Sequence, residues 1–171
     1  MGHRTGKTSP CQQRINLRNS QKRLEELLAA NWEEGAQLVT LTYNQTQKAP
    51  SIKVAALQRN AWFRYLREKH GTLRYIRSTE QASIPGGYPV HRVVLFPSMP
   101  SVASLRAFWT YGPIEIEPLH DYTPEAIAAL FMRQTLGNQE NAKTEGRAWS
   151  PSAGLPHPKK ENKHEPEAFE V

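Results

Sequence analysis

The residue types that could do chemistry lie on or beside segments with the pattern of β-strands. Thr40 and Thr42 share one face of a predicted strand, where their hydroxyls could line a groove for DNA, although threonine is common in strands anyway. Three arginines fall on strands or strand ends, and a basic sheet face of this kind could follow a phosphate backbone or simply be solvated: Arg74, Arg77 and Arg92. One interpretation of this group is therefore a nucleic-acid surface.

Aromatic and titratable side chains add a few further candidates. Trp109 and Tyr111 stand at the end of a predicted helix near a glycine, which makes them candidates for stacking on bases. A histidine on an apolar strand, such as His91, is typical of a packed or hydrogen-bonded side chain, and a strand-end carboxylate such as Glu80 is typical of a solvated one. These patterns alone leave both roles open.

The elements that must position these residues follow from hydrophobic periodicity, caps and breakers. We expect helices over about 20–34, 52–69 and 101–109, and a last helix that starts at Thr123 with Pro124 in its first turn. We expect strands over about 37–43, 73–80, 88–96 and 114–119. This order predicts an α+β fold with a ferredoxin-like split β-α-β-β-α-β antiparallel sheet, helices on one face, and a further helix at each end.

The flanks differ in composition from this central part. Residues 1–14 predict a disordered basic arm, 15–137 the folded domain, and 138–171 a tail that is mostly disordered or laid over the surface. The net charge of +6 and the pI of about 9.6 favour a polyanionic partner such as nucleic acid. Cys11 is the single cysteine, so the sequence holds no disulfide framework and no CxxC metal site. Without an apolar run long enough for a membrane span, or the apolar core of a signal peptide, we expect a cytoplasmic protein.

Several segments together resemble the HUH replication initiators of rolling-circle phages and plasmids. Asn31-Trp32 followed by Leu38–Tyr43 is similar to the opening motif of that family, and Tyr75–Glu80 to its second strand, which ends in Thr-Glu. Tyr88–Leu95 lies where the family carries its His-hydrophobic-His strand. The other matching segments are Leu105–Trp109 with Gly112, Ile114–Leu119 and Gly146–Ser152. The order and spacing of these segments, from about Ser20 to Pro156, carry the resemblance.

The resemblance implies metal-dependent nicking and joining of single-stranded DNA. In that family two histidines and a nearby carboxylate bind a divalent metal that polarises a phosphate, and a tyrosine on a following helix attacks it. Carried over to this chain, the resemblance implies Mg²⁺ or Mn²⁺ held by His91 and Glu80, with Arg133 and Arg147 in basic positions of the later motifs. It also implies single-stranded or hairpin DNA as partner, with a helicase or polymerase of the host, since the chain has no room for a helicase domain.

Two positions depart from the family pattern. Pro89 stands where the first histidine is expected, and Leu130 where the last helix should carry the nucleophilic tyrosine. Tyr122, just before that helix, is the fallback nucleophile, and its other interpretation is an ordinary loop tyrosine. We therefore expect a replication-associated DNA-binding protein whose nicking activity is in question. The alternatives are a non-catalytic DNA-binding regulator of a mobile element, or an RNA-binding domain, whose aromatic strand signature is missing.

Overall fold

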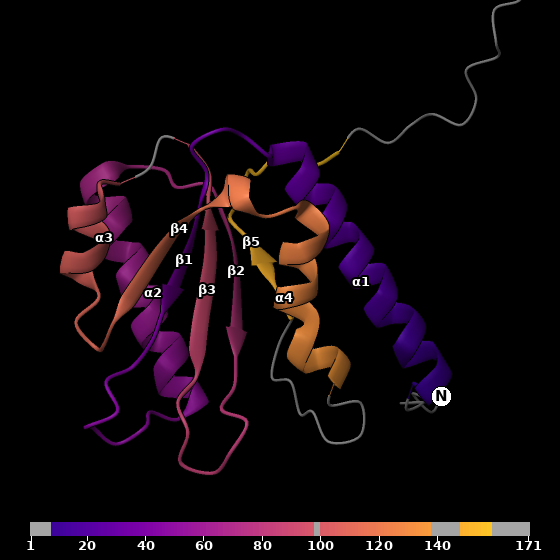
Figure 1. Cartoon of the computed structure of the whole chain (residues 1–171), viewed down its shortest axis with the longest axis horizontal. Coiled ribbons are helices and arrows are strands. Elements are labelled where there is room, and N and C mark those ends of the chain that lie inside the picture. Colours follow the sequence, from indigo (N-terminus) through magenta and orange to yellow (C-terminus); the bar gives the residue numbers. More distant parts are fainter. Residues whose placement is uncertain (1–7, 98–99, 138–147, 159–171) are drawn as a thin grey trace, which may run out of the picture.

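A computed structural model describes residues 8–97, 100–137 and 148–158 of the chain. In these ranges a five-stranded antiparallel sheet has the order β4-β1-β3-β2-β5 and is covered by helices on both faces (Figure 1). The helices are α1 (Pro10–Asn31), α2 (Ile52–His70), α3 (Val102–Phe108) and α4 (Pro124–Gly137), with a 3₁₀ turn η1 (Leu119–Asp121). The strands are β1 (Gln37–Leu41), β2 (Tyr75–Glu80), β3 (Val90–Leu95), β4 (Ile114–Pro118) and β5 (Ser150–Pro151).

The order of the predicted helices and strands, and the antiparallel α+β class, are confirmed. Local signals explain why: the Ser51 hydroxyl accepts a hydrogen bond from the backbone N–H of Val54 and starts α2, and Gly71, with a φ of 81°, ends it. The two helices between strands, α2 and α3, lie on one face of the sheet, and the terminal helices α1 and α4 cover the other (Figure 1). Because both faces are covered, β3 and the residue after it bury four consecutive apolar side chains, Val93 to Phe96.

The predicted start of the first helix was wrong. Helix α1 begins at Pro10 instead of near Ser20, so residues 10–14 are helical and do not belong to a disordered arm. The Ser9 side chain accepts a hydrogen bond from the backbone N–H of Gln12, and Pro10 occupies the first helical position. Residues 1–7 of the predicted arm lie outside the described residues.

Part of the predicted tail belongs to the fold. Strand β5 pairs with β2, and Ser152 extends that pairing because its hydroxyl accepts from the backbone N–H of Tyr75 at 2.9 Å. Leu155 is buried against α1 and α4, and the Asn31 side chain donates to the carbonyl of Pro156 at 2.7 Å. The sheet is therefore closed on this side by a segment whose sequence shows little periodicity.

Candidate functional site

Several of the predicted site residues gather on the face of the sheet that α1 and α4 cover only in part. The strand register places Thr40 opposite Arg92, and Glu80 opposite Val90. Helices α1 and α4 pack on the half of this face that carries Leu38, Ile76 and Val94, and polar side chains occupy the other half. We call that other half the polar half-face; it consists of Thr40, Thr42, Glu80, Val90, Arg92 and Glu115, which pairs with Thr40.

Two arginines bind the carboxylate of Glu80. Arg92 Nη1 lies 2.6 Å from Glu80 Oε2, and Arg133 Nη2, which comes from α4, lies 2.9 and 2.8 Å from the two carboxylate oxygens. Burial raises the pKa of Glu80, but the hydrogen bonds and charges of Arg92 and Arg133 outweigh it and hold this pKa below its ordinary value. The three groups therefore carry one net positive charge at neutral pH.

His91 lies on the opposite face of the sheet and is completely buried. Its Nε2 is 3.0 Å from the hydroxyl of Tyr43, and its Nδ1 is 2.8 Å from the hydroxyl of Thr79. Burial, followed by the positive charges of Arg59 and Arg77, lowers the pKa of His91 to about 3. His91 is therefore neutral, with both ring nitrogens engaged inside the protein.

Glu80 and His91 do not fit the metal site that the family resemblance implies. Glu80 pairs with Val90, and His91 pairs with Thr79, so successive residues direct the two ligand candidates to opposite faces. The carboxylate is already neutralised by two guanidinium groups, and the imidazole has no free nitrogen. Within the described residues there is also no group of three or more His, Cys, Asp or Glu side chains that could hold an ion. The structure does not bring together a site for Mg²⁺ or Mn²⁺ at this pair.

The fallback nucleophile Tyr122 lies far from Glu80. Its hydroxyl donates to Glu117 Oε2 at 3.0 Å. Glu117 is on β4, three strand spacings across the sheet and four residues along it from Glu80, which separates the two backbones by on the order of 19 Å. That hydrogen bond is the main reason why the pKa of Tyr122 is raised, which disfavours the phenolate. At the expected tyrosine position, Leu130 packs against the core instead.

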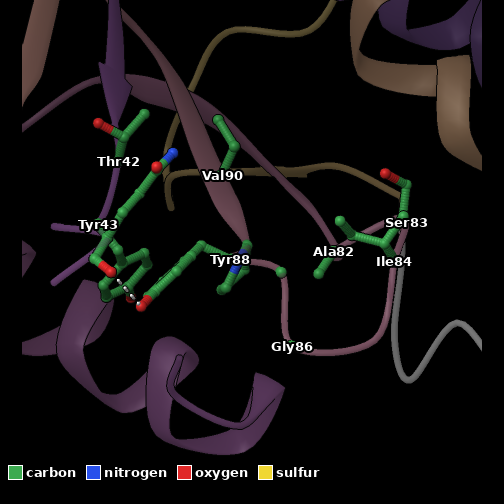
Figure 2. Close-up of a pocket in the computed structure, with 11 residues that line it drawn as sticks. Thr42, Tyr43, Ala82, Ser83, Ile84, Gly86, Tyr88 and Val90 are labelled. Atoms are coloured by element: carbon green, nitrogen blue, oxygen red, sulfur yellow. Dashed lines mark hydrogen bonds between the residues drawn. The ribbon is translucent and has the colours of Figure 1, made fainter. Parts of the chain in front are cut away.

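A pocket of about 570 Å³ lies beside the polar half-face, at the end of the sheet (Figure 2). It is lined by Thr42 and Tyr43 after β1, by Tyr88 and Val90 before and in β3, and by the loop over 82–87. The Tyr88 hydroxyl donates to the carbonyls of Gln45 and Gln47, which ties the two walls of the pocket together. None of the described residues that line it is charged, so hydroxyl, amide and aromatic groups provide its polar and stacking contacts.

Sequence reasoning missed this pocket and misplaced one of its neighbours. Tyr88 follows the Pro85-Gly86-Gly87 turn, and that turn was the only available signal. Trp109, expected as a stacking platform, is 3% exposed, and its indole N–H donates to the carbonyl of Thr42 at 2.9 Å. Trp109 therefore packs behind the pocket wall. Gly112 lies there as well, because a Cβ at residue 112 would meet the same carbonyl oxygen at 2.5 Å.

The remaining predicted arginines do not form one basic sheet face. Arg77 pairs with Val93 and points to the α2 face, whereas Arg92 points to the α4 face. Arg74 donates to Glu33 and to the carbonyl of Pro97 at the other end of β2. Arg147 lies outside the described residues.

A more strongly basic surface lies on α1. The segment from Thr8 to Leu24 contains no acidic residue, and four exposed cations lie within it: Arg14, Arg18, Lys22 and Arg23. The first three are spaced by four residues, so they form one line along the helix, which we call the cationic stripe. Figure 1 shows the N-terminal half of α1 at the same end of the molecule as the loop between β2 and β3, which forms part of the pocket.

No family model, curated protein or solved structure matches this chain. None of the helices in the described ranges is both long and apolar enough to cross a membrane.

Proposed function

We propose that this protein binds single-stranded DNA without cutting it, as a non-catalytic relative of the HUH replication initiators. The observation that carries the proposal is the cationic stripe of α1 at the same end of the molecule as the neutral, tyrosine-lined pocket. The strand order β4-β1-β3-β2, with α2 and α3 on one face, agrees with the ferredoxin-like order that the resemblance implies, and this agreement supports the proposed relationship.

The cationic stripe supplies the charge that a nucleic-acid backbone requires. Phosphate contacts from Lys and Arg release counterions, which provides most of the affinity of non-specific binding. The same helix carries exposed amide side chains on its other sides, Gln12, Gln13, Asn16 and Asn19, which can hydrogen-bond to phosphates and bases without adding negative charge. The helix is rigidly placed because its C-terminal half buries Leu24, Leu27 and Leu28 against the core.

The pocket favours a single strand over a duplex. A base reaches a pocket only when it is unstacked, and binding of single strands commonly combines a basic groove with aromatic contacts to bases. Tyr88, which is partly exposed, offers such a contact in a pocket large enough for one base, and the buried ring of Tyr43, with its centroid 6.3 Å away, packs beside it. Arg133 and Arg92, next to Val90 of the pocket wall, would then face the backbone of the same strand.

Loss of cleavage follows from the arrangement of the expected catalytic residues. A nicking reaction of this family needs a metal next to a tyrosine nucleophile. Here Arg92 and Arg133 bind the carboxylate of Glu80, and His91 is buried on the other face of the sheet. The hydroxyl of Tyr122 is hydrogen-bonded to Glu117. Two guanidinium groups thus stand where the family would place a cation.

The experiment is a paired binding and cleavage assay on labelled oligonucleotides. We expect a mobility shift with single-stranded and hairpin DNA at low salt, and neither a shortened strand nor an SDS-resistant adduct with Mg²⁺ or Mn²⁺. A duplex of the same sequence and a single-stranded RNA serve as competitors. Tighter binding of duplex or RNA than of single-stranded DNA would overturn the assigned substrate, and a covalent adduct would overturn the loss of cleavage.

A further inference from the structure

Arg59 on α2 is a buried cation without an acidic partner among the described residues. The side chain is 7% exposed and packs against the sheet on the face that α2 and α3 cover. Its Nη1 donates to Thr79 Oγ1 at 3.1 Å, and Nε and Nη2 donate to Asn60 Oδ1 at 3.3 and 3.1 Å. These neutral oxygens satisfy three of its five N–H groups but leave its charge uncompensated, whereas buried arginines are normally paired with an acid.

Arg77 places a second guanidinium group in the same region. It lies two residues before Thr79 on β2, so both side chains point to the face that α2 covers. Arg77 is half-buried, and its side chain makes no hydrogen bond or ion pair with any described residue. Burial, and then the charge of Arg77, lowers the pKa of Arg59 to about 10, and burial lowers the pKa of Arg77 as well.

Arg77 is the more exposed member of this pair, since it is half-buried and Arg59 is buried. Its neighbours across the sheet are Val93 of β3 and Ser150 of β5, and β5 is a two-residue strand at the edge of the sheet. An anion at this edge would meet the donors of Arg77 that bind no described residue, and would also be attracted by the positive charge of the neighbouring Arg59.

We propose that Arg59 and Arg77 form a binding site for a phosphate group at the β2–β5 edge. Two guanidinium groups present planar pairs of N–H donors that match phosphate oxygens. A doubly charged inorganic phosphate compensates both cations at once, and a singly charged backbone phosphate compensates one of them. The phosphate is either inorganic phosphate or a backbone phosphate of a nucleic acid. This site lies on the opposite face of the sheet from the polar half-face, so it does not depend on the proposed function.

The test is thermal unfolding of the full chain in low millimolar phosphate, compared with chloride at equal ionic strength and pH. For the wild type we expect the Tm to rise saturably, by about 3 °C or more once phosphate is well above its Kd. Arg77→Gln should abolish this response and should raise the Tm in chloride, because it removes the repulsion of Arg59. Arg77→Glu should raise the Tm in chloride further, because it supplies the missing counter-charge.

Arg64→Gln is the matched control. Arg64 is an exposed cation on α2, the helix that also carries Arg59, and it makes no ion pair with any described residue. It should keep the full phosphate response, and a response that Arg77→Gln shares with it would identify a general salt effect and overturn the site. If Arg77→Gln lowers the Tm in chloride and phosphate does not stabilise the wild type, Arg77 has a partner within the protein and the proposal is wrong.

A second experiment measures oligonucleotide affinity and distinguishes the two sources of the phosphate. A loss of affinity in Arg77→Gln, but not in Arg64→Gln, assigns the site to a backbone phosphate. Unchanged affinity together with an abolished phosphate response assigns it to the free anion. Failure of the protein to bind any oligonucleotide would overturn the proposed function but leave the phosphate response of Arg59 and Arg77 intact.

Discussion

Glu80 and His91 point to opposite faces of the sheet, although β2 and β3 bring their backbones within one residue of direct opposition. Glu80 pairs with Val90, and His91 pairs with Thr79. The carboxylate is therefore bound by two arginines on the α4 face, and the imidazole is buried by Tyr43 and Thr79 on the α2 face. This separation turns a predicted metal site into two unrelated structural features, and each gives a testable expectation.

Glu80→Gln should weaken the fold at neutral pH and strengthen DNA binding. The variant loses the ionic part of its bonds to Arg92 and Arg133, and about 1 kcal/mol is a suitable scale because the carboxylate is partly exposed. It also frees both guanidinium groups for phosphate. Urea unfolding and fluorescence anisotropy measure the two effects, and unchanged DNA affinity would show that the polar half-face lies outside the DNA interface.

The same bonds make the wild type sensitive to acid. Since the pKa of Glu80 is lowered in the folded protein, its contribution is present above the ordinary pKa of a glutamate and is lost as the pH falls through the folded value. Glu80→Gln should therefore lose less stability than the wild type when the pH is lowered through the acidic range. Urea titrations at stepped pH values compare the two slopes, and parallel slopes would contradict the shift.

His91 should contribute a separate pH dependence at milder acidity. Its pKa is about 3 in the folded protein and about 6.5 in an unfolded chain, so the unfolded state binds the proton more readily between these values. The wild type should lose stability, by several kcal/mol in total, as the pH falls from about 6.5 toward 3. His91→Gln should cost about 2 kcal/mol at pH 7 but show a flatter decline, since glutamine does not titrate. A His91 imidazole that titrates near pH 6 by NMR in the folded wild type would contradict the burial of His91 as a neutral group.

Gly112→Ala should damage the pocket through the backbone. A Cβ at this position would lie 2.5 Å from the carbonyl oxygen of Thr42 and 2.6 Å from the backbone nitrogen of Asn44. Backbone atoms cannot move aside as a flexible side chain does, so we expect a loss of about 2 kcal/mol in unfolding free energy and weaker DNA binding. Thr110→Ala is the control, because Thr110 is exposed two residues earlier. Equal stability of both variants would show that residue 112 has room for a Cβ beside the carbonyl oxygen of Thr42.

The sequence predicted the elements well because buried strands and amphipathic helices leave periodic patterns. It failed at α1, where residues 10–16 are mostly polar and exposed, so only the Ser9-Pro10 pair could have indicated the helix start. It also failed at the site, because the face to which His91 points relative to Glu80 depends on the register of β2 and β3. A loop of nine residues, 81–89, joins these strands, and a one-residue change in pairing would reverse the face of every side chain. The neighbours of Arg77 and Arg92 were hidden for the same reason.

The salt dependence of single-stranded DNA binding shows whether the DNA backbone lies along the cationic stripe. We expect log K to fall linearly with log salt concentration, with a slope that becomes less steep by about 2 when Arg14, Arg18 and Lys22 are all replaced by glutamine, since each neutralised phosphate of a single strand accounts for roughly 0.7 of the slope. The control replaces three exposed cations of α2, Lys53, Arg64 and Arg67, which removes the same charge from the other face of the sheet. A slope that changes only in the α1 variant supports binding along the cationic stripe, and equal slopes for the wild type and the α1 variant would contradict it.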